Sequence, residues 1–122
     1  MIRSDFLLRQ FSQFIQALIN LLLKRKDSIS FEEQQSYAKI GTSLLGIDGN
    51  QLYKMSAESI IEFFTKTDYS VEKLEIAAYL LLLDQQKNPI SHKDVIKTLL
   101  MYVNEHSDTY SSDREIMIQS LK

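Results

Sequence analysis

The sequence predicts an all-α fold, with five to six helices in antiparallel hairpins that form an orthogonal bundle or a tetratricopeptide-like array. Three observations predict this class. Apolar residues recur at helical spacing, no segment sustains an alternation with period two, and only three Gly and one Pro occur. The length of 122 residues suits one domain. We therefore treat 1–122 as a single helical domain.

The first expected helix contains the longest amphipathic run, from Phe6 to Leu23. On a helical wheel its large apolar side chains fill an arc of roughly 160°, and Gln, Ser and Asn take the opposite side. Ser4 or Asp5 should cap this helix, which should end near Arg25. The basic residues there suit the negative end of the helix dipole: Lys24, Arg25 and Lys26.

The second helix should begin at Ser30, which forms a capping-box pattern with Glu33, and should end at Gly46. Gly41 falls on its apolar face, where the missing side chain allows a neighbouring backbone to come close. The apolar face is expected to contain Phe31, Tyr37, Ala38, Ile40, Leu44 and Leu45.

A turn at 48–50 and a short helical bridge through Leu52, Tyr53 and Met55 precede a third helix. Ser56 should cap this helix, with Phe63 off its buried side. The buried side should contain Ile60, Ile61 and Phe64.

The fourth helix, from Val71 to about Gln86 after a cap at Asp68 or Ser70, is apolar on two opposite sides. A helix of this kind belongs at the centre of a fold. The sequence predicts a soluble first turn containing Glu72, Lys73 and Glu75, and a stop at Asn88 and Pro89.

Two further capping-box patterns predict the last helices, Ser91 with Asp94 and Ser112 with Glu115. The fifth helix should run to about Asn104. Its expected apolar face contains Val95, Ile96, Leu99, Leu100, Tyr102 and Val103. The apolar residues expected in the final helix are Ile116, Met117, Ile118 and Leu121.

The net charge of −2 is unevenly distributed, because the first 26 residues hold five basic groups against one acid. The remaining 96 residues therefore carry a net charge of −6. This asymmetry indicates internal complementarity or a mixed solvated surface, with an anionic partner at Lys24–Lys26 as the alternative.

Residue types that carry chemistry are sparse. The absence of cysteine excludes disulfides, thiol catalysis and thiolate metal sites. His92 and His106 lack the spacing of metal ligands on one helix face, so each should be a solvated histidine at a helix end. Without a glycine-rich phosphate loop or a nucleophile elbow, we expect no enzyme, no catalytic residue, no cofactor and no metal.

The spacing of aromatic and apolar residues bears on partners and location. Aromatic residues follow core spacing and are not interleaved with basic ones, so we expect no nucleic-acid binding. Polar residues interrupt the first apolar run, which argues against a secretory signal, and the longest unbroken apolar stretch, Ile76–Leu83, is too short to span a bilayer. We expect a cytoplasmic chain without a transmembrane segment.

Three stretches carry a resemblance to a known family: the N-terminal residues Met1, Ile2 and Asp5–Arg9, the helix exit Leu44–Asp48, and the helix start Met55–Glu58. Over about the first 85 residues the chain resembles an uncharacterised bacterial family of short helical proteins, a domain of unknown function. The resemblance implies a cytosolic all-helical fold with tetratricopeptide-like hairpins. It offers no functional residues that could be carried over.

The first helix also suggests a function, because five of its residues follow the alternating three-and-four spacing of a coiled-coil seam. These candidate interface residues are Leu8, Phe11, Ile15, Leu18 and Leu22. We expect a non-enzymatic protein–protein interaction module that self-associates, for example as a homodimer. The alternatives are a peptide- or small-ligand-binding helical module, a peripheral membrane-surface binder, and a first helix that buries its whole arc within its own domain.

Overall fold

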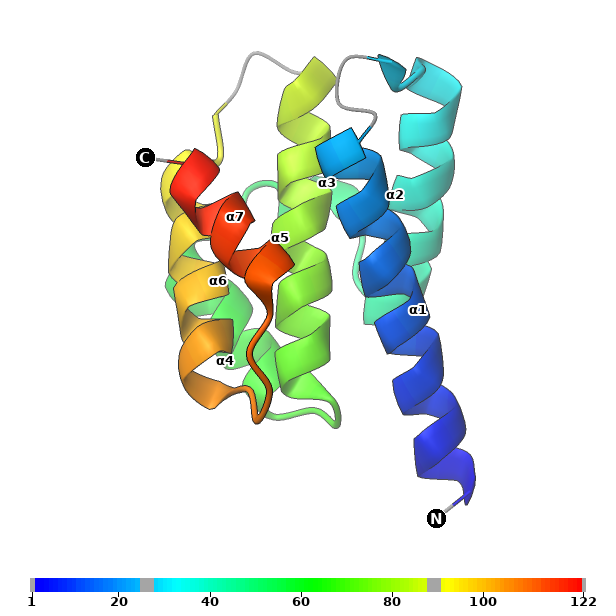
Figure 1. Cartoon of the computed structure of the whole chain (residues 1–122), viewed down its shortest axis with the longest axis vertical. Coiled ribbons are helices and arrows are strands. Elements are labelled where there is room, and N and C mark those ends of the chain that lie inside the picture. The colour runs from blue at the N-terminus through cyan, green and yellow to red at the C-terminus, as the bar shows by residue number, and fades with distance from the viewer. Residues whose placement is uncertain (1, 25–27, 88–90, 122) are drawn as a thin grey trace.

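The computed structural model of the chain describes residues 2–24, 28–87 and 91–121, which form seven helices and no strand (Figure 1). The all-α class is therefore confirmed. The helices are α1 (Ile2–Lys24), α2 (Phe31–Leu45), α3 (Gly49–Leu52), α4 (Ala57–Thr65), α5 (Ser70–Lys87), α6 (Lys93–His106) and α7 (Ser112–Ser120).

Helix α5 lies at the centre of the bundle, as its two apolar sides predict (Figure 1). Every side chain from Leu74 to Leu83 is buried, and α1, α2, α4 and α6 all pack against this helix. Because the helices surround a central one, the arrangement is a helical bundle. It gives no support to a tetratricopeptide-like array, in which successive helix pairs stack in a row.

Several helix ends lie where local sequence signals place them. Ser30 and Glu33 form the expected capping box, and Ser56 caps α4 by accepting a hydrogen bond from the Ser59 amide. Gly46 ends α2 with a φ of 72°, a left-handed conformation that favours glycine. These three predictions are confirmed.

Other expected ends are wrong. Helix α1 already begins at Ile2, so Ser4 and Asp5 lie inside it. The capping box expected at Ser91 does not form, because the residue before α6 is His92, which makes no side-chain cap. Helix α7 is capped by Ser111 instead of Ser112. Four residues of the predicted helix boundaries, Arg25, Lys26, Asn88 and Pro89, lie outside the described residues.

The buried face of α2 is rotated relative to the expected one. Phe31 and Ile40 are exposed, whereas Gln34 is buried and donates a hydrogen bond to the Leu83 carbonyl oxygen. Gly41 does mark a close contact, since a Cβ added there would lie 2.6 Å from Leu80 Cδ1. The neighbour that comes close is a side chain of α5, not its backbone. Glycine thus sets the distance between α2 and the central helix.

The N-terminal turns of α1 extend past the other helices at the lower right of Figure 1. Phe6 is 59% exposed and Leu8 is 40% exposed in this segment. Further along the helix, Leu18 and Leu22 are buried against the bundle. One helix therefore contributes both to the core and to an exposed surface.

Candidate functional site

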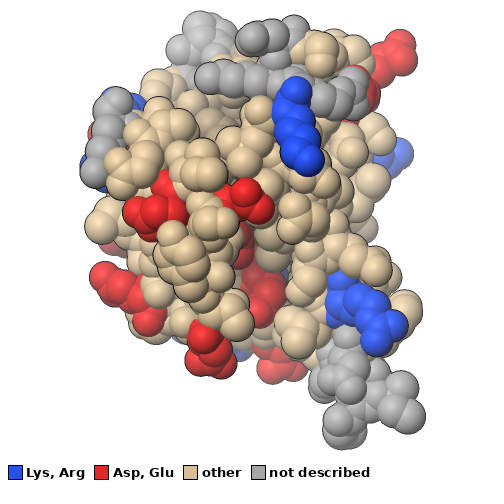
Figure 2. Space-filling view, viewed as in Figure 1, with Lys and Arg blue, Asp and Glu red and all other residues tan. Residues whose placement is uncertain are grey.

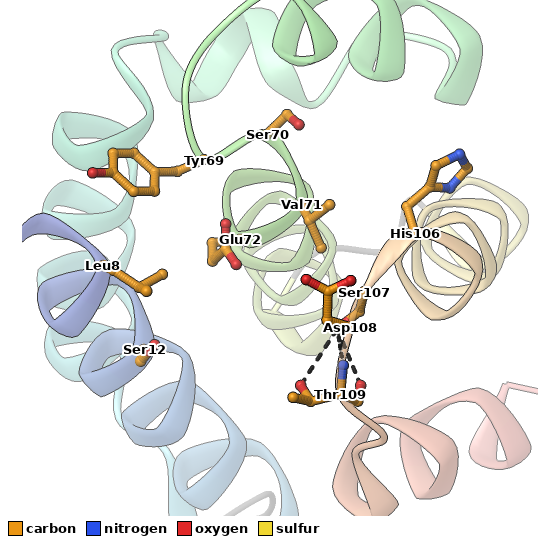
Figure 3. A pocket seen from close by; sticks show the side chains of 10 residues that line it. All are labelled: Leu8, Ser12, Tyr69, Ser70, Val71, Glu72, His106, Ser107, Asp108 and Thr109. Carbon is orange, nitrogen blue, oxygen red and sulfur yellow. Dashed lines mark hydrogen bonds between the residues drawn. The ribbon is translucent and has the colours of Figure 1, made fainter. Parts of the chain in front are cut away.

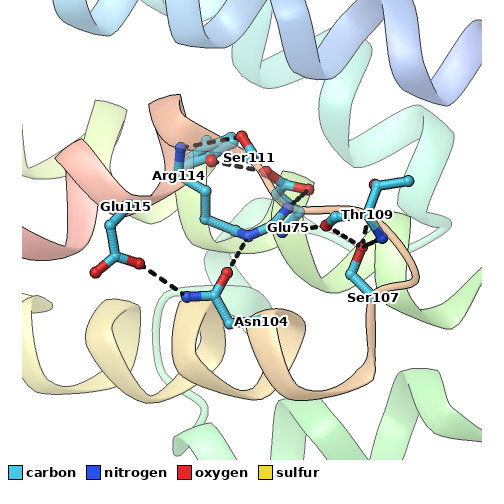
Figure 4. Close-up of polar contacts among 8 residues, drawn as sticks. Glu75, Asn104, Ser107, Thr109, Ser111, Arg114 and Glu115 are labelled. Atoms are coloured by element: carbon cyan, nitrogen blue, oxygen red, sulfur yellow. Dashed lines mark hydrogen bonds and ion pairs between the residues drawn. The ribbon is translucent and has the colours of Figure 1, made fainter.

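A buried polar network joins α5, α6 and α7 (Figure 4). Arg114 is 4% exposed, and its guanidinium donates to Glu75 Oε1 at 3.2 Å, to Asn104 Oδ1 at 2.6 Å and to the Thr109 carbonyl at 3.1 Å. The other oxygen of Glu75 accepts from the Tyr79 hydroxyl at 2.7 Å. Glu75 was expected in a soluble first turn, and that prediction is wrong.

The network is a structural element, because its members satisfy one another. Burial, together with the charge of Glu75 and its hydrogen bond, raises the pKa of Tyr79 far above its usual value, so this phenol stays protonated and donates. Arg114 fixes the segment before α7 to the centre of the fold. Glu75 and Arg114 form a hydrogen bond although 39 positions separate them in the sequence, and no local sequence pattern indicates such a contact.

A second buried pair lies at the opposite end of α5. His92 Nε2 lies 2.9 Å from Asp84 Oδ2, with side-chain exposures of 6% and 11%. The His92 amide donates to Gln85 Oε1 at 2.9 Å, and the Tyr53 ring lies 6.0 Å from the imidazole. Burial and the negative Asp84 raise the pKa of Tyr53. The expectation of a solvated His92 is therefore wrong, and this histidine joins α6 to α5.

His106 matches its expected environment. It is exposed in the last turn of α6, with its ring stacked on Tyr102 at 3.9 Å between ring centroids and its Nδ1 2.9 Å from the Tyr102 carbonyl oxygen. Within 2–24, 28–87 and 91–121, no group of three or more His, Asp and Glu side chains is placed to hold a metal ion.

An open cleft of about 510 Å³ lies where α1 passes the beginning of α5 (Figure 3). Leu8 and Ser12 line one side, Val71 and Glu72 come from α5, and the segment 106–109 closes the other side.

The polar groups of this cleft are partly used within the fold. The Ser107 hydroxyl donates to the Thr109 carbonyl at 3.1 Å and accepts from the Thr109 amide at 3.2 Å. Tyr69 has a φ of 60°, which is unusual for a residue other than glycine, and its ring packs 5.4 Å from Phe11. The cleft thus has ligand-like size, and part of its polar lining is already used within the fold.

The predicted seam on α1 is largely buried within the chain itself. Phe11, Leu18 and Leu22 belong to the hydrophobic core, and Ile15 is half-buried against it. Leu8 alone of the five candidates is exposed, and it lines the cleft of Figure 3. The five residues together are therefore not available as one contact surface.

A different face of α1 forms an open groove with α2. The groove has a volume of about 530 Å³ and continues toward the end of α1 through shared residues Ala17 and Tyr37. At its base the Phe14 and Tyr37 rings stack at 6.2 Å between centroids. The main hollow, named here the α1–α2 groove, is lined by Gln10, Gln13, Phe14, Ala17, Ser36, Tyr37, Ile40 and Leu44.

The α1–α2 groove contains no charged lining residue in its main hollow. From Gln10 to Leu23 the sequence of α1 has no charge at all, and Figure 2 shows this stretch between two basic side chains. Acidic side chains gather instead over the lower part of that view, around α6 and α7. Sequence reasoning missed the groove because it placed Ile40 in the core and the Gln residues on an ordinary solvated face.

The stretch Phe6–Lys24 of α1 is long and apolar enough to cross a membrane, judged by length and composition alone. One third of that stretch (33%) is buried inside the fold, and core helices and N-terminal signal sequences pass the same test. The absence of a transmembrane segment therefore stays a prediction.

Comparison of the chain with protein-family models, with curated proteins and with solved structures found no match. The resemblance to a bacterial domain family also stays a prediction.

Proposed function

We propose that this chain is a non-enzymatic protein–protein interaction module whose contact surface is the α1–α2 groove. The observation that carries the proposal is an exposed apolar hollow whose polar lining is entirely uncharged. Protein interfaces are depleted of charged residues at their centre and use shape and apolar contact there. The groove also has the form that receives an apolar helix face in helix-in-groove recognition.

The interior supports the same proposal. The buried ionisable groups, Glu75 with Arg114 and Asp84 with His92, are paired with each other and connect helices. These pairs stabilise the packing of the helices. We therefore look for the functional site on the surface of the bundle.

The test is capture of binding partners by the tagged chain in cells, with covalent cross-linking before lysis. Ile40→Lys puts a charge in the groove, and Met101→Lys is a matched control because both side chains are 48% exposed. We expect the wild type and Met101→Lys to retain the same cross-linked proteins, and Ile40→Lys to lose them. A second copy of the chain counts as one of these proteins. Equal capture by both variants, or no cross-linked protein with any of them, would overturn the proposal.

A second candidate function, binding of a small ligand, is favoured by the size of the Figure 3 cleft, which lies within the usual range for ligand pockets. A fragment screen monitored by amide chemical shifts distinguishes the two. Saturable shifts at Val71 and Thr109 would support it, and shifts at neither residue would remove it.

A further inference from the structure

The α1–α2 groove has the electrostatic properties of a surface that can bind the same surface on a second copy of the chain. In a two-fold symmetric dimer the same patch lies on both sides, so a charge close to the axis faces the same charge on the other copy. The main hollow of the groove has no charged lining residue, although charged residues make up 25% of the chain, and Lys24 lines only its continuation toward the end of α1. A partner with a complementary charged surface would find nothing to pair with here.

The polar groups of the groove are also suited to self-pairing. Gln10, Gln13 and Ser36 each carry both a donor and an acceptor, as does the Tyr37 hydroxyl. A patch of amides and hydroxyls can therefore satisfy its own copy after the contact excludes water. Ile40 projects from the same surface as an exposed apolar side chain that can enter the hollow of a facing copy.

The apolar surface extends further along α1. Phe6 lies one helical turn before Gln10 on the same side, and it is 59% exposed. From Phe6 to Lys24 the helix rises about 27 Å, and two packed helices span about 20 Å, which gives roughly 500 Å² per copy. A standard interface buries about 800 Å² per partner, so this contact is large enough for a weak dimer.

Resting on the function proposed above, we infer that the partner of the α1–α2 groove is a second copy of this chain, paired about a two-fold axis that passes close to Gln13 and Ile40. The contact is isologous, with each Ile40 inserted into the hollow of the other copy. A contact of this size is typical of weak, transient complexes.

The test exploits the symmetry. Gln13→Glu places two negative charges close together across the axis, and Gln13→Lys places two positive charges there. Each variant alone should weaken self-association at least tenfold at low salt, measured by sedimentation equilibrium. An equimolar mixture of the two should form a heterodimer at least as tight as the wild-type dimer, because opposite charges then face each other.

Gln16 supplies the matched control, since it is also an exposed glutamine of α1 but does not line the groove. Gln16→Glu and Gln16→Lys should leave the dissociation constant within twofold of wild type. Variants at Gln13 that dimerise like wild type, or a mixture that stays as weak as its components, would overturn the inference.

The outcomes also separate this inference from the proposed function. A wild-type chain that stays monomeric up to about 1 mM refutes the second copy as partner, since a weak dimer forms well below that concentration. If Ile40-dependent capture of another protein persists in that case, the interaction module stands and only its partner has changed. If Ile40→Lys captures everything that the wild type does, the groove itself is the wrong surface.

Discussion

Replacing Arg114 by methionine tests the physical role of the buried network. The substitution keeps most of the side-chain length but removes the charge and three donated hydrogen bonds. Glu75 is then left as an uncompensated carboxylate at 6% exposure, which still accepts a hydrogen bond from the Tyr79 hydroxyl. Breaking a buried ion pair by removing one partner costs about 3–5 kcal/mol.

The same loss can be expressed as a melting temperature. An unfolding entropy of about 2.1 cal/mol/K per residue gives roughly 0.26 kcal/mol/K for this chain, so the midpoint should fall by about 12–20 °C. Adding Glu75→Gln removes the orphaned charge while its amide oxygen still accepts from Tyr79. The double variant should therefore be more stable than Arg114→Met alone, by about 1–2 kcal/mol.

Thermal and urea unfolding followed by far-ultraviolet circular dichroism measure these differences for the two single variants, the double variant and the wild type. The control is Lys66→Met, which removes an exposed i,i+4 partner of Glu62 and should change stability by less than about 0.5 kcal/mol. An Arg114→Met loss below about 1 kcal/mol, or a double variant that loses the full sum of both single losses, would show that Arg114 and Glu75 do not stabilise the fold as a pair.

Three further predictions concern single contacts. Gly41→Ala should destabilise the fold by about 1–3 kcal/mol in urea unfolding, because its Cβ would lie within 3.1 Å of three atoms of the buried Leu80 side chain. His92→Ala should cost about 1–3 kcal/mol and speed amide exchange at the start of α6, since it removes the buried partner of Asp84. Stability should be intact below about pH 10 and fall above it by up to about 1.4 kcal/mol per pH unit for Tyr79, because the folded state keeps a proton that the unfolded state releases.

Each of these has a matched control. Gly49→Ala should be neutral or slightly stabilising, since its Cβ would make ordinary contact with Thr42 Cγ2 at 3.5 Å. His106→Ala should leave stability nearly unchanged, because that ring is exposed. Tyr110→Phe should keep the alkaline slope of the wild type, whereas Tyr79→Phe should reduce it. A control that changes as much as its test variant would show that the assigned contact is not the cause.

Features set by local sequence were predictable. The capping box at Ser30, the helix end at Gly46 and the close contact at Gly41 depend on residues within a few positions or on a missing side chain. The central place of α5 follows from apolar residues on both of its sides. Such signals act over one or two helical turns, where the sequence fully specifies the neighbours.

Features set by distant partners were not predictable. Gln34 is buried because it reaches a carbonyl oxygen 49 residues away, and Glu75 because Arg114 lies opposite it. A polar residue is expected to be exposed unless its hydrogen-bond or ion-pair partner is known, and no spacing pattern in the sequence indicates such a partner. The rotation of α2 involves the same residue, since Gln34 is buried on this helix whereas Ile40 is exposed and lines the groove.

Pairing of the protein with a second copy through the α1–α2 groove can be tested by amide chemical shifts recorded during dilution from about 1 mM to about 10 μM. We expect concentration-dependent shifts at Gln13, Tyr37 and Ile40, with those at Gln16 and Met101 unchanged. Shifts confined to the Figure 3 cleft, at Val71 and Thr109, or a spectrum that does not change with concentration, would contradict it.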